Sequence, residues 1–217
     1  MSARIASFLI ISYLLSSCCR ENCANTYIIE GVVSEASTTL PCIGFEVELK
    51  EQILENGILN GFFETAGKTT TDESGFFSIS FPRKNALEYK LEVSSEGWFT
   101  FVEDINPEDF TPEIPIHIDL IATPRAQLTI QIINASPSFK NDKVRVRMLG
   151  DFGTLTDCGN EWFVFEGPSV NDEINCSLPG DKWMPYLFIN QSYEDDIEVM
   201  DSVFCVEFET TVLEINY

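Results

Sequence analysis

Few side chains in this sequence belong to the types that usually carry catalysis. The single histidine, His117, lies between Ile116 and Ile118 and shares a face with Pro115 and Asp119. A lone histidine on a strand is more often a surface residue than a catalyst. No Gly-x-Ser-x-Gly segment offers a nucleophile elbow. We therefore expect that the chain is not an enzyme.

Carboxylates are abundant, with 35 Asp and Glu against 13 Lys and Arg, and a pair of them could cleave a glycosidic bond. The two carboxyl groups of such a pair must lie ~5–5.5 Å or ~6.5–9.5 Å apart. The sequence alone does not give the distance between any two carboxyl groups. Most of these acids are expected on solvated surfaces, where they keep an exposed protein soluble. A carboxylate-dependent hydrolase is therefore the third of three hypotheses.

One acidic stretch offers the oxygen ligands that calcium prefers. Asp104, Asn106, Glu108 and Asp109 begin like a calcium-binding loop, but the glycine at the sixth position and the distal glutamate are missing. These four residues are the candidate metal ligands, and Glu194-Asp195-Asp196 is another candidate group. We expect no cofactor, with calcium as the alternative.

The three tryptophans could each stack on a sugar ring. Trp98 directly follows Gly97 and is expected to pack against the protein instead. Trp183 follows a Pro-Gly-Asp-Lys turn and begins a predicted strand at the edge of a loop. Trp183 is therefore the candidate for contact with a ligand.

The N-terminus has the pattern of an export signal. The apolar run Phe8–Leu15 is too short to span a bilayer as a helix, which takes about 20 residues, and it has the length of a signal-peptide core. The following Leu-Ser-Ser-Cys segment resembles the lipobox of bacterial lipoproteins. That resemblance implies a signal peptide over residues 1–17, lipidation of Cys18 and a tether over 18–26. It implies a location in the cell envelope, with the outer membrane expected and the leaflet left open.

The formal charge of −22 limits the possible partners. Nucleic acid is excluded as an expected partner, because phosphate binding needs a basic surface. Electrostatic docking on anionic lipid is disfavoured for the same reason. We expect contact with the membrane through the lipid anchor alone.

Seven cysteines fit an oxidising compartment, where disulfides persist. With Cys18 lipidated, six cysteines remain and permit 15 pairings, among which the sequence does not choose. We expect Cys158 to pair with Cys176 or Cys205. No Cys-x-x-Cys pair occurs, so a zinc ribbon has no support.

The hydrophobic pattern of residues 27–123 has a period of two. Phe45, Val47 and Leu49, for example, alternate with charged residues, as a strand with one buried face requires. The pattern predicts an all-β fold, with two small antiparallel sandwich domains over residues 27–123 and 124–217. In the first domain we expect strands at Tyr27–Ser34, Ile43–Lys50, Phe63–Thr71, Gly75–Phe81, Leu87–Ser95 and Ile114–Ala122.

The first domain resembles a known family. Its Gly31-Val32-Val33 segment, the Thr-Asp-Glu-Ser-Gly-Phe-Phe hairpin at Thr71–Phe77 and the Gly97-Trp98 pair are similar to those of the carboxypeptidase regulatory-like domain, a transthyretin-like sandwich. The resemblance implies a scaffold without catalytic activity. The stretch 51–61 departs from it, since it is longer than the usual connection.

The second domain has no family resemblance, and it is no evident repeat of the first, because the Thr-Asp-x-x-Gly-x-Phe turn does not recur. Pro124-Arg125 looks like a hinge between the two domains. As a whole, the chain resembles small two-domain lipoproteins of Bacteroidota. We therefore predict a lipid-anchored binding module for a protein or glycan partner, with a structural or assembly subunit of a surface complex as the alternative.

Overall fold

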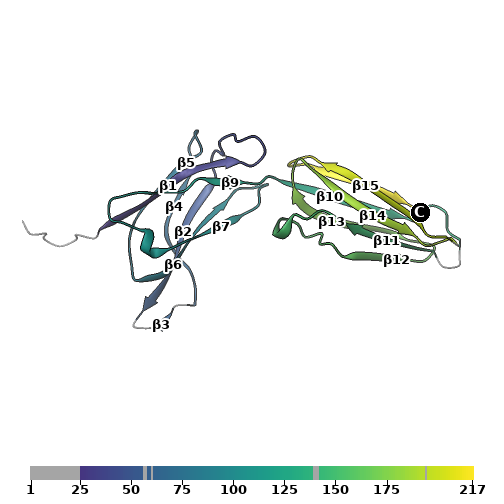
Figure 1. The fold of residues 1–217 in the computed structure, drawn as a ribbon, viewed down its shortest axis with the longest axis horizontal. Coiled ribbons are helices and arrows are strands. Elements are labelled where there is room, and N and C mark those ends of the chain that lie inside the picture. The colour runs from purple at the N-terminus through teal and green to yellow at the C-terminus, as the bar shows by residue number, and fades with distance from the viewer. Residues whose placement is uncertain (1–24, 56–57, 60, 139–141, 194) are drawn as a thin grey trace, which may run out of the picture.

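The computed structural model describes residues 25–217, except residues 56–57, 60, 139–141 and 194. It consists of two lobes built almost entirely of strands (Figure 1), which confirms the predicted all-β sandwich fold. The N-terminal lobe contains β1 (Thr26–Glu35), β2 (Glu46–Glu55), β3 (Ile58–Leu59), β4 (Glu64–Thr70), β5 (Phe76–Pro82), β6 (Ala86–Ser94), β7 (Phe101–Ile105), β8 (Ile116–His117) and β9 (Leu120–Ala122). A short 3-10 helix, η1 (Pro107–Asp109), follows β7.

Two sheets face each other in this lobe. In the first, β1 pairs antiparallel with β5 and parallel with β8 and β9. In the second, the antiparallel order is β4-β2-β6-β7, and the short β3 pairs with the end of β2. The predicted alternation is confirmed here, since one face of each central strand is buried between the sheets. The fully buried side chains include Ile29, Val47, Leu49, Phe77, Phe81, Tyr89 and Leu91.

The Thr-Asp-x-x-Gly-x-Phe hairpin forms as its residues predict. The Oδ1 of Asp72 accepts hydrogen bonds from the backbone N–H groups of Ser74 (2.8 Å) and Phe76 (3.0 Å), which closes the turn before β5. The Ser74 hydroxyl also donates to this Oδ1, at 2.7 Å, and this bond, followed by the two backbone bonds, holds the pKa of Asp72 below its usual range. Gly75 has φ +75°, a conformation that favours glycine, and a Cβ there would lie 2.5 Å from the carbonyl oxygen of Val33.

The C-terminal lobe is a second sandwich. Its strands are β10 (Arg125–Ile133), β11 (Lys143–Met148), β12 (Trp162–Glu166), β13 (Asn171–Pro179), β14 (Lys182–Asn190), β15 (Ile197–Cys205) and β16 (Thr210–Asn216), with a 3-10 helix, η2 (Gly153–Leu155). In one sheet, β10 pairs antiparallel with β13 and parallel with β16. The other sheet has the antiparallel order β12-β11-β14-β15.

The two lobes share one strand topology. In each, the first strand pairs antiparallel with a strand from the middle of the lobe and parallel with the last strand, as β1 does with β5 and β9, and β10 with β13 and β16. The opposite sheets correspond in the same way, β4-β2-β6-β7 to β12-β11-β14-β15. The second lobe therefore repeats the first in topology, although the hairpin motif does not recur. The parallel pairs add to the antiparallel sandwich predicted from the sequence.

Each lobe has its own hydrophobic core, and the two sets of core residues do not overlap. A disulfide joins Cys158 to Cys176 within the second core, which settles the pairing that the sequence left open. Cys205 does not take part, because its buried thiol is free.

Three local expectations were wrong. The stretch 51–61 is not simply a long connection, since β2 continues through residues 51–55. The single strand expected at Ile114–Ala122 is broken into β8 and β9, where the Ile118 N–H donates to the Glu30 carbonyl and a Cβ on Gly31 would lie 1.7 Å from the Ile118 oxygen. Finally, β7 was not predicted, because Ile105 is its only fully buried residue.

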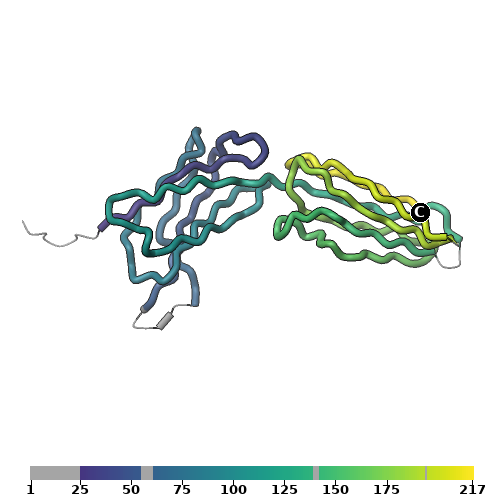
Figure 2. Tube along the Cα trace, in the orientation of Figure 1, coloured from purple at the N-terminus to yellow at the C-terminus, as the bar shows by residue number. Residues whose placement is uncertain are grey.

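The lobes lie end to end, so the molecule is elongated (Figure 2). β1 runs toward the junction, where Glu35 pairs with Ala122, and β10 runs away from it. Strands of this length, at ~3.3 Å per residue, place the beginning of β1 and the end of β16 roughly 60 Å apart. No helix in the described part of the chain is long and apolar enough to cross a membrane.

Candidate functional site at the junction of the lobes

Only Thr123 and Pro124 separate β9 from β10, and both carbonyls are hydrogen-bonded. The Thr123 carbonyl accepts from the Phe99 N–H of the N-terminal lobe at 3.1 Å. The Pro124 carbonyl accepts from the Gly180 N–H of the C-terminal lobe at 2.9 Å. The expected hinge is therefore a short linker whose backbone is tied to both lobes.

An aromatic contact crosses the junction beside this linker. The rings of Trp98 and Phe208 lie with their centroids 5.3 Å apart, and Trp98 also packs edge-on against Phe45 at 4.9 Å. Gly97 is required for this approach, because it has φ +80° and a Cβ there would lie 3.0 Å from the Phe208 ring. The packing predicted for Trp98 is thus present, and it extends from the first core to the second lobe.

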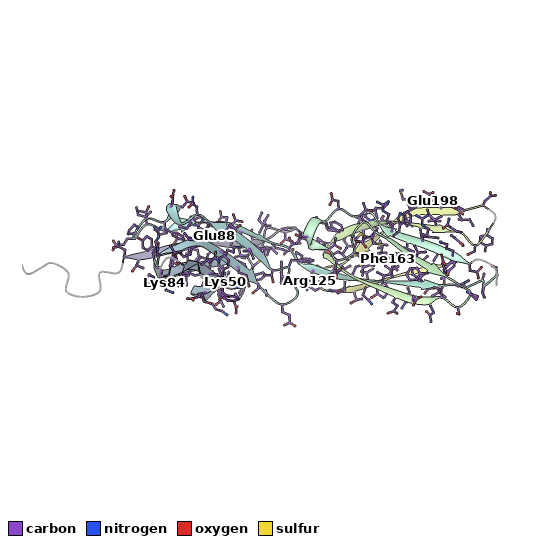
Figure 3. The ribbon with its side chains drawn as sticks, turned by 90° about the horizontal axis from the view of Figure 1, so that it is seen from below. Lys50, Lys84, Glu88, Arg125, Phe163 and Glu198 are labelled. Carbon is purple, nitrogen blue, oxygen red and sulfur yellow. A yellow bond between two sulfur atoms is a disulfide. The ribbon has the colours of Figure 1, made fainter. Side chains whose placement is uncertain are left out.

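Arg125, the first residue of β10, lies at the junction (Figure 3) and contacts the N-terminal lobe through its backbone and its side chain. Its backbone N–H donates to the Gly97 carbonyl at 2.9 Å, and its carbonyl accepts from the Phe208 N–H at 2.8 Å. Its guanidinium lies 4.7 Å from the centroid of the Phe99 ring, and Nη2 donates to the Trp98 carbonyl at 3.3 Å. A cation over an aromatic face is stabilised by the ring quadrupole, so this side chain binds the second lobe to the first.

Two carboxyl groups also meet at the junction. Burial raises the pKa of Glu207 above its usual range, and the charges of Glu35 and Asp181 raise it further. Glu35 belongs to the N-terminal lobe, whereas Glu207 and Asp181 belong to the C-terminal lobe. Close packing explains the burial, since a Cβ on Gly180 would lie 2.5 Å from the Glu207 Cβ. The junction is therefore weakened by like charge when these groups are ionised.

A small cavity of about 250 Å³ opens at the junction and is lined by Phe99, Arg125, Thr154, Thr156, Asp157 and Ser177. Asp157 is already engaged there, because its Oδ1 accepts from the Ser177 N–H at 2.5 Å. Hydroxyl groups and one guanidinium can hold water or a small polar molecule. This set contains neither a histidine nor a cysteine.

The candidate calcium ligands lie on β7 and around η1. Asp104 lies on β7, with its Oδ1 3.7 Å from the Nζ of Lys90. Asn106 caps η1, since its Oδ1 accepts from the Glu108 N–H at 3.0 Å, and Asp109 closes that same turn. Across the described ranges, no group of three or more His, Cys, Asp or Glu side chains could hold a metal ion.

Of the other singled-out residues, Trp183 and Cys205 lie on the paired strands β14 and β15, and His117 lies on β8 in the other lobe. Cys18 lies outside the described residues. His117 is exposed, and its Nε2 lies 3.1 Å from the Asp119 Oδ1. Burial raises the pKa of the free Cys205 thiol above its usual range. Trp183 is 62% exposed and packs against Phe204 with the ring centroids 5.3 Å apart.

Sequence reasoning missed Phe99, Phe208 and Glu207 as junction residues. Phe208 lies in the turn between β15 and β16, with φ +59°. The available signals in the sequence were a phenylalanine in a turn, Phe208, and the distant Gly97-Trp98 pair. They do not identify the pairing, because the two segments are 110 residues apart.

No protein-family profile and no curated protein matches the chain. Among solved structures it is similar to a streptococcal ancillary pilin, with 13% identity, a TM-score of 0.36 and coverage of 90% of this chain and 63% of that one. The Bacillus anthracis TIE protein has 11% identity and a TM-score of 0.35, with 88% and 34% covered. The shaft pilin SpaA of Lactobacillus rhamnosus GG has 9% identity and a TM-score of 0.33, with 88% and 97% covered.

The chain thus spans less than two thirds of the length of the first two of these structures. At such identities and TM-scores, the likeness concerns the all-β fold alone. What the chain's own geometry adds is a junction in which a two-residue linker, an aromatic pair and one arginine hold two sandwich lobes end to end.

Proposed function

We propose that this chain is a non-enzymatic structural or assembly subunit of a bacterial cell surface, built as a short stiff rod. The observation that carries the proposal is the braced junction, in which the carbonyl oxygens of both linker residues are bonded, one to each lobe. Domains joined by a free linker reorient relative to each other by default. Here reorientation would break the bonds of Arg125 and the Trp98–Phe208 contact together.

The direction of the chain fits a spacer. Its first described strand begins in the first lobe at one end of the molecule, and the chain ends at the far end of the second lobe, where Figure 1 marks the C-terminus. A lipid on Cys18 would hold the first lobe at the membrane and place the far end of the second lobe roughly 60 Å from the beginning of β1. The charge of −22 would keep such a rod away from anionic lipid headgroups.

Export is supported by the disulfide as well as by the N-terminal pattern. Disulfides persist in oxidising compartments and are rare where thiols are kept reduced. The Cys158–Cys176 bond therefore agrees with a location in the cell envelope, anchored through Cys18. A Cys18→Ser variant expressed with its signal peptide should leave the membrane fraction and appear in the soluble fraction, whereas the wild-type chain should stay with the membrane.

A binding module is the second candidate function. It is favoured by the exposed aromatic pair of Trp183 and Phe204, which lies outside both cores. The two functions are compatible, because a rod that carries its second lobe away from the membrane also presents any surface on that lobe.

Small-angle X-ray scattering on the exported Cys18→Ser chain tests the rod. We expect one elongated conformation to fit the data. Phe208→Asn removes the ring that contacts Trp98 while keeping a residue that tolerates a left-handed backbone, and it should broaden the distribution of lobe orientations. Val206→Asn makes the same change in the same turn, at a side chain that is 37% exposed, and is the matched control. A wild-type curve that needs many lobe orientations would contradict the proposal.

A further inference from the structure

The outer face of the second lobe's four-stranded sheet carries an unusual set of side chains. By the pairing register, one row across the sheet is Trp162, Arg147, Leu187 and Met200. The next row is Val164, Arg145, Ile189 and Glu198. Trp183 and Phe204 lie opposite each other at the junction end. We call this set the outer face, and its exposed fractions reach 68% at Met200 and 48% at Val164.

The two arginines of the outer face have aromatic partners rather than acidic ones. The guanidinium of Arg145 lies 4.3 Å from the Trp162 ring centroid, and that of Arg147 lies 5.6 Å from it. The Nε of Arg147 donates to the Asn160 Oδ1 at 2.6 Å. Within the described residues, neither arginine forms an ion pair, although the chain has 35 carboxylates. Their planar donor groups are suited to carboxylates.

The matching sheet of the first lobe shows that the fold does not impose this pattern. On its outer face, Lys50 pairs with Glu92 at 2.7 Å and Lys68 with Glu46 at 2.6 Å. Lys90 lies 3.7 Å from Asp104. These ion pairs are typical of a solvated surface. The second lobe's sheet has one such ion pair on the same side, Lys143–Glu166 at 2.6 Å, in the row beyond Val164 and Arg145. The two sheets therefore differ in the rows of Arg145 and Arg147, where these arginines lie beside exposed apolar side chains.

We propose that the outer face is a docking surface for a protein partner whose contact surface presents carboxylates among apolar side chains. Protein interfaces are enriched in tryptophan, phenylalanine, methionine and arginine and depleted in lysine and acids. The outer face has that composition, with Glu198 as its one acid among the side chains named above.

Other occupants fit the outer face less well. A second copy docked by the same face would bring the arginines of the central strand β11 against each other, and like charges across an interface are repelled. A glycan would leave hydroxyl groups on aliphatic side chains such as Leu187 and Ile189, where they lose hydrogen bonds with water. A carboxylate-bearing apolar protein surface meets both the arginines and the aliphatic rows.

This inference deepens the proposed function, since a structural subunit must bind a partner, but it can be tested separately. A photo-crosslinking benzoylphenylalanine is placed at Met200 on the edge strand β15 and, as the matched control, at Val102 on the corresponding edge strand β7. Both side chains are exposed, at 68% and 50%. The full chain is expressed in its native bacterium and irradiated in intact cells.

We expect a discrete crosslink to one other protein from position 200 and none from position 102. Arg145→Glu combined with Arg147→Glu should lower the crosslink yield about tenfold or more, since an unpaired charge at an interface is costly. Lys182→Glu makes the same kind of charge change on the opposite side of β14 and should leave the yield unchanged. Circular dichroism on each purified variant checks that it folds.

The partner's contact peptide, identified by mass spectrometry, then gives the decisive experiment. A Glu→Arg or Asp→Arg change in that peptide should restore the crosslink with the doubly reversed chain. Failure to restore it, a crosslink to a second copy, or no crosslink from position 200 would each overturn the proposal. Binding of the purified chain to alginate that is lost in the same arginine variant would identify a glycan site and also overturn it. Phe208→Asn should keep the crosslink, which separates this result from a failure of the rod.

Discussion

Removing the Cys158–Cys176 disulfide should destabilise the second lobe alone. The two cysteines are 18 residues apart in sequence. Closing a loop of that size lowers the entropy of the unfolded chain by about 11 cal/mol/K, which corresponds to about 3 kcal/mol at 25 °C. The two cores share no residue, so this loss should not reach the first lobe.

Hydrogen exchange read by mass spectrometry resolves the two lobes in one experiment. In a Cys158→Ala, Cys176→Ala variant, the slowest amides of β10 and β14 should exchange on the order of a hundredfold faster, which is the rate equivalent of about 3 kcal/mol. The slowest amides of β2 and β6 should not change. Both cysteine side chains are buried, at 2% and 1% exposure, so some of the loss comes from the space that they leave.

A single Cys205→Ala change controls for that space, because Cys205 is a fully buried free thiol of the same core. We expect its effect to be clearly smaller than that of the double variant. An equal loss of amide protection in Cys205→Ala and in the double variant would refute the loop-entropy reasoning. Equal losses in both lobes would refute the independence of the two cores.

Three further predictions concern single residues. Gly75→Ala should lower the free energy of unfolding by more than Gly44→Ala does in urea titrations, because both have φ +75° but only Gly75 has a backbone oxygen 2.5 Å from the new Cβ. Lys84→Met should lower the free energy of unfolding by about 3 kcal/mol in the same assay, because it removes the cation that lies 2.8 Å from the Glu51 carboxylate, which is 1% exposed. Adding Glu51→Gln to that variant should recover most of the lost free energy, because the buried group is then neutral. The raised pKa of Glu207 means that the folded chain binds the proton of this carboxyl group more tightly than the unfolded chain does. The contribution of Glu207 to the free energy of unfolding is therefore complete below the ordinary pKa of 4.5 and is lost as the pH rises through the folded-state pKa. Glu207→Gln should therefore flatten the fall of melting temperature with rising pH, and an unchanged slope would contradict the role of the carboxyl contact.

Much of the strand structure could be predicted because alternation is a local property. Val47 and Leu49 are apolar between charged neighbours, and a strand with one buried face is the conformation that separates them. The turn at Asp72 is equally local, since its side chain bonds to N–H groups two and four residues later. The same reasoning could not find β7, whose middle residues all face solvent.

The sequence by itself determined that this is an acidic all-β chain with two halves, and it left the disulfide pairing open. Only the tertiary structure decided that the halves repeat one topology, that Cys176 is the partner and that Trp98, Arg125 and Phe208 brace the junction. It also decided that Arg145 and Arg147 stack on Trp162 on an exposed sheet face. The physical reason is that alternation records only which side of a strand is buried, whereas these contacts depend on which distant strands pair and in what register.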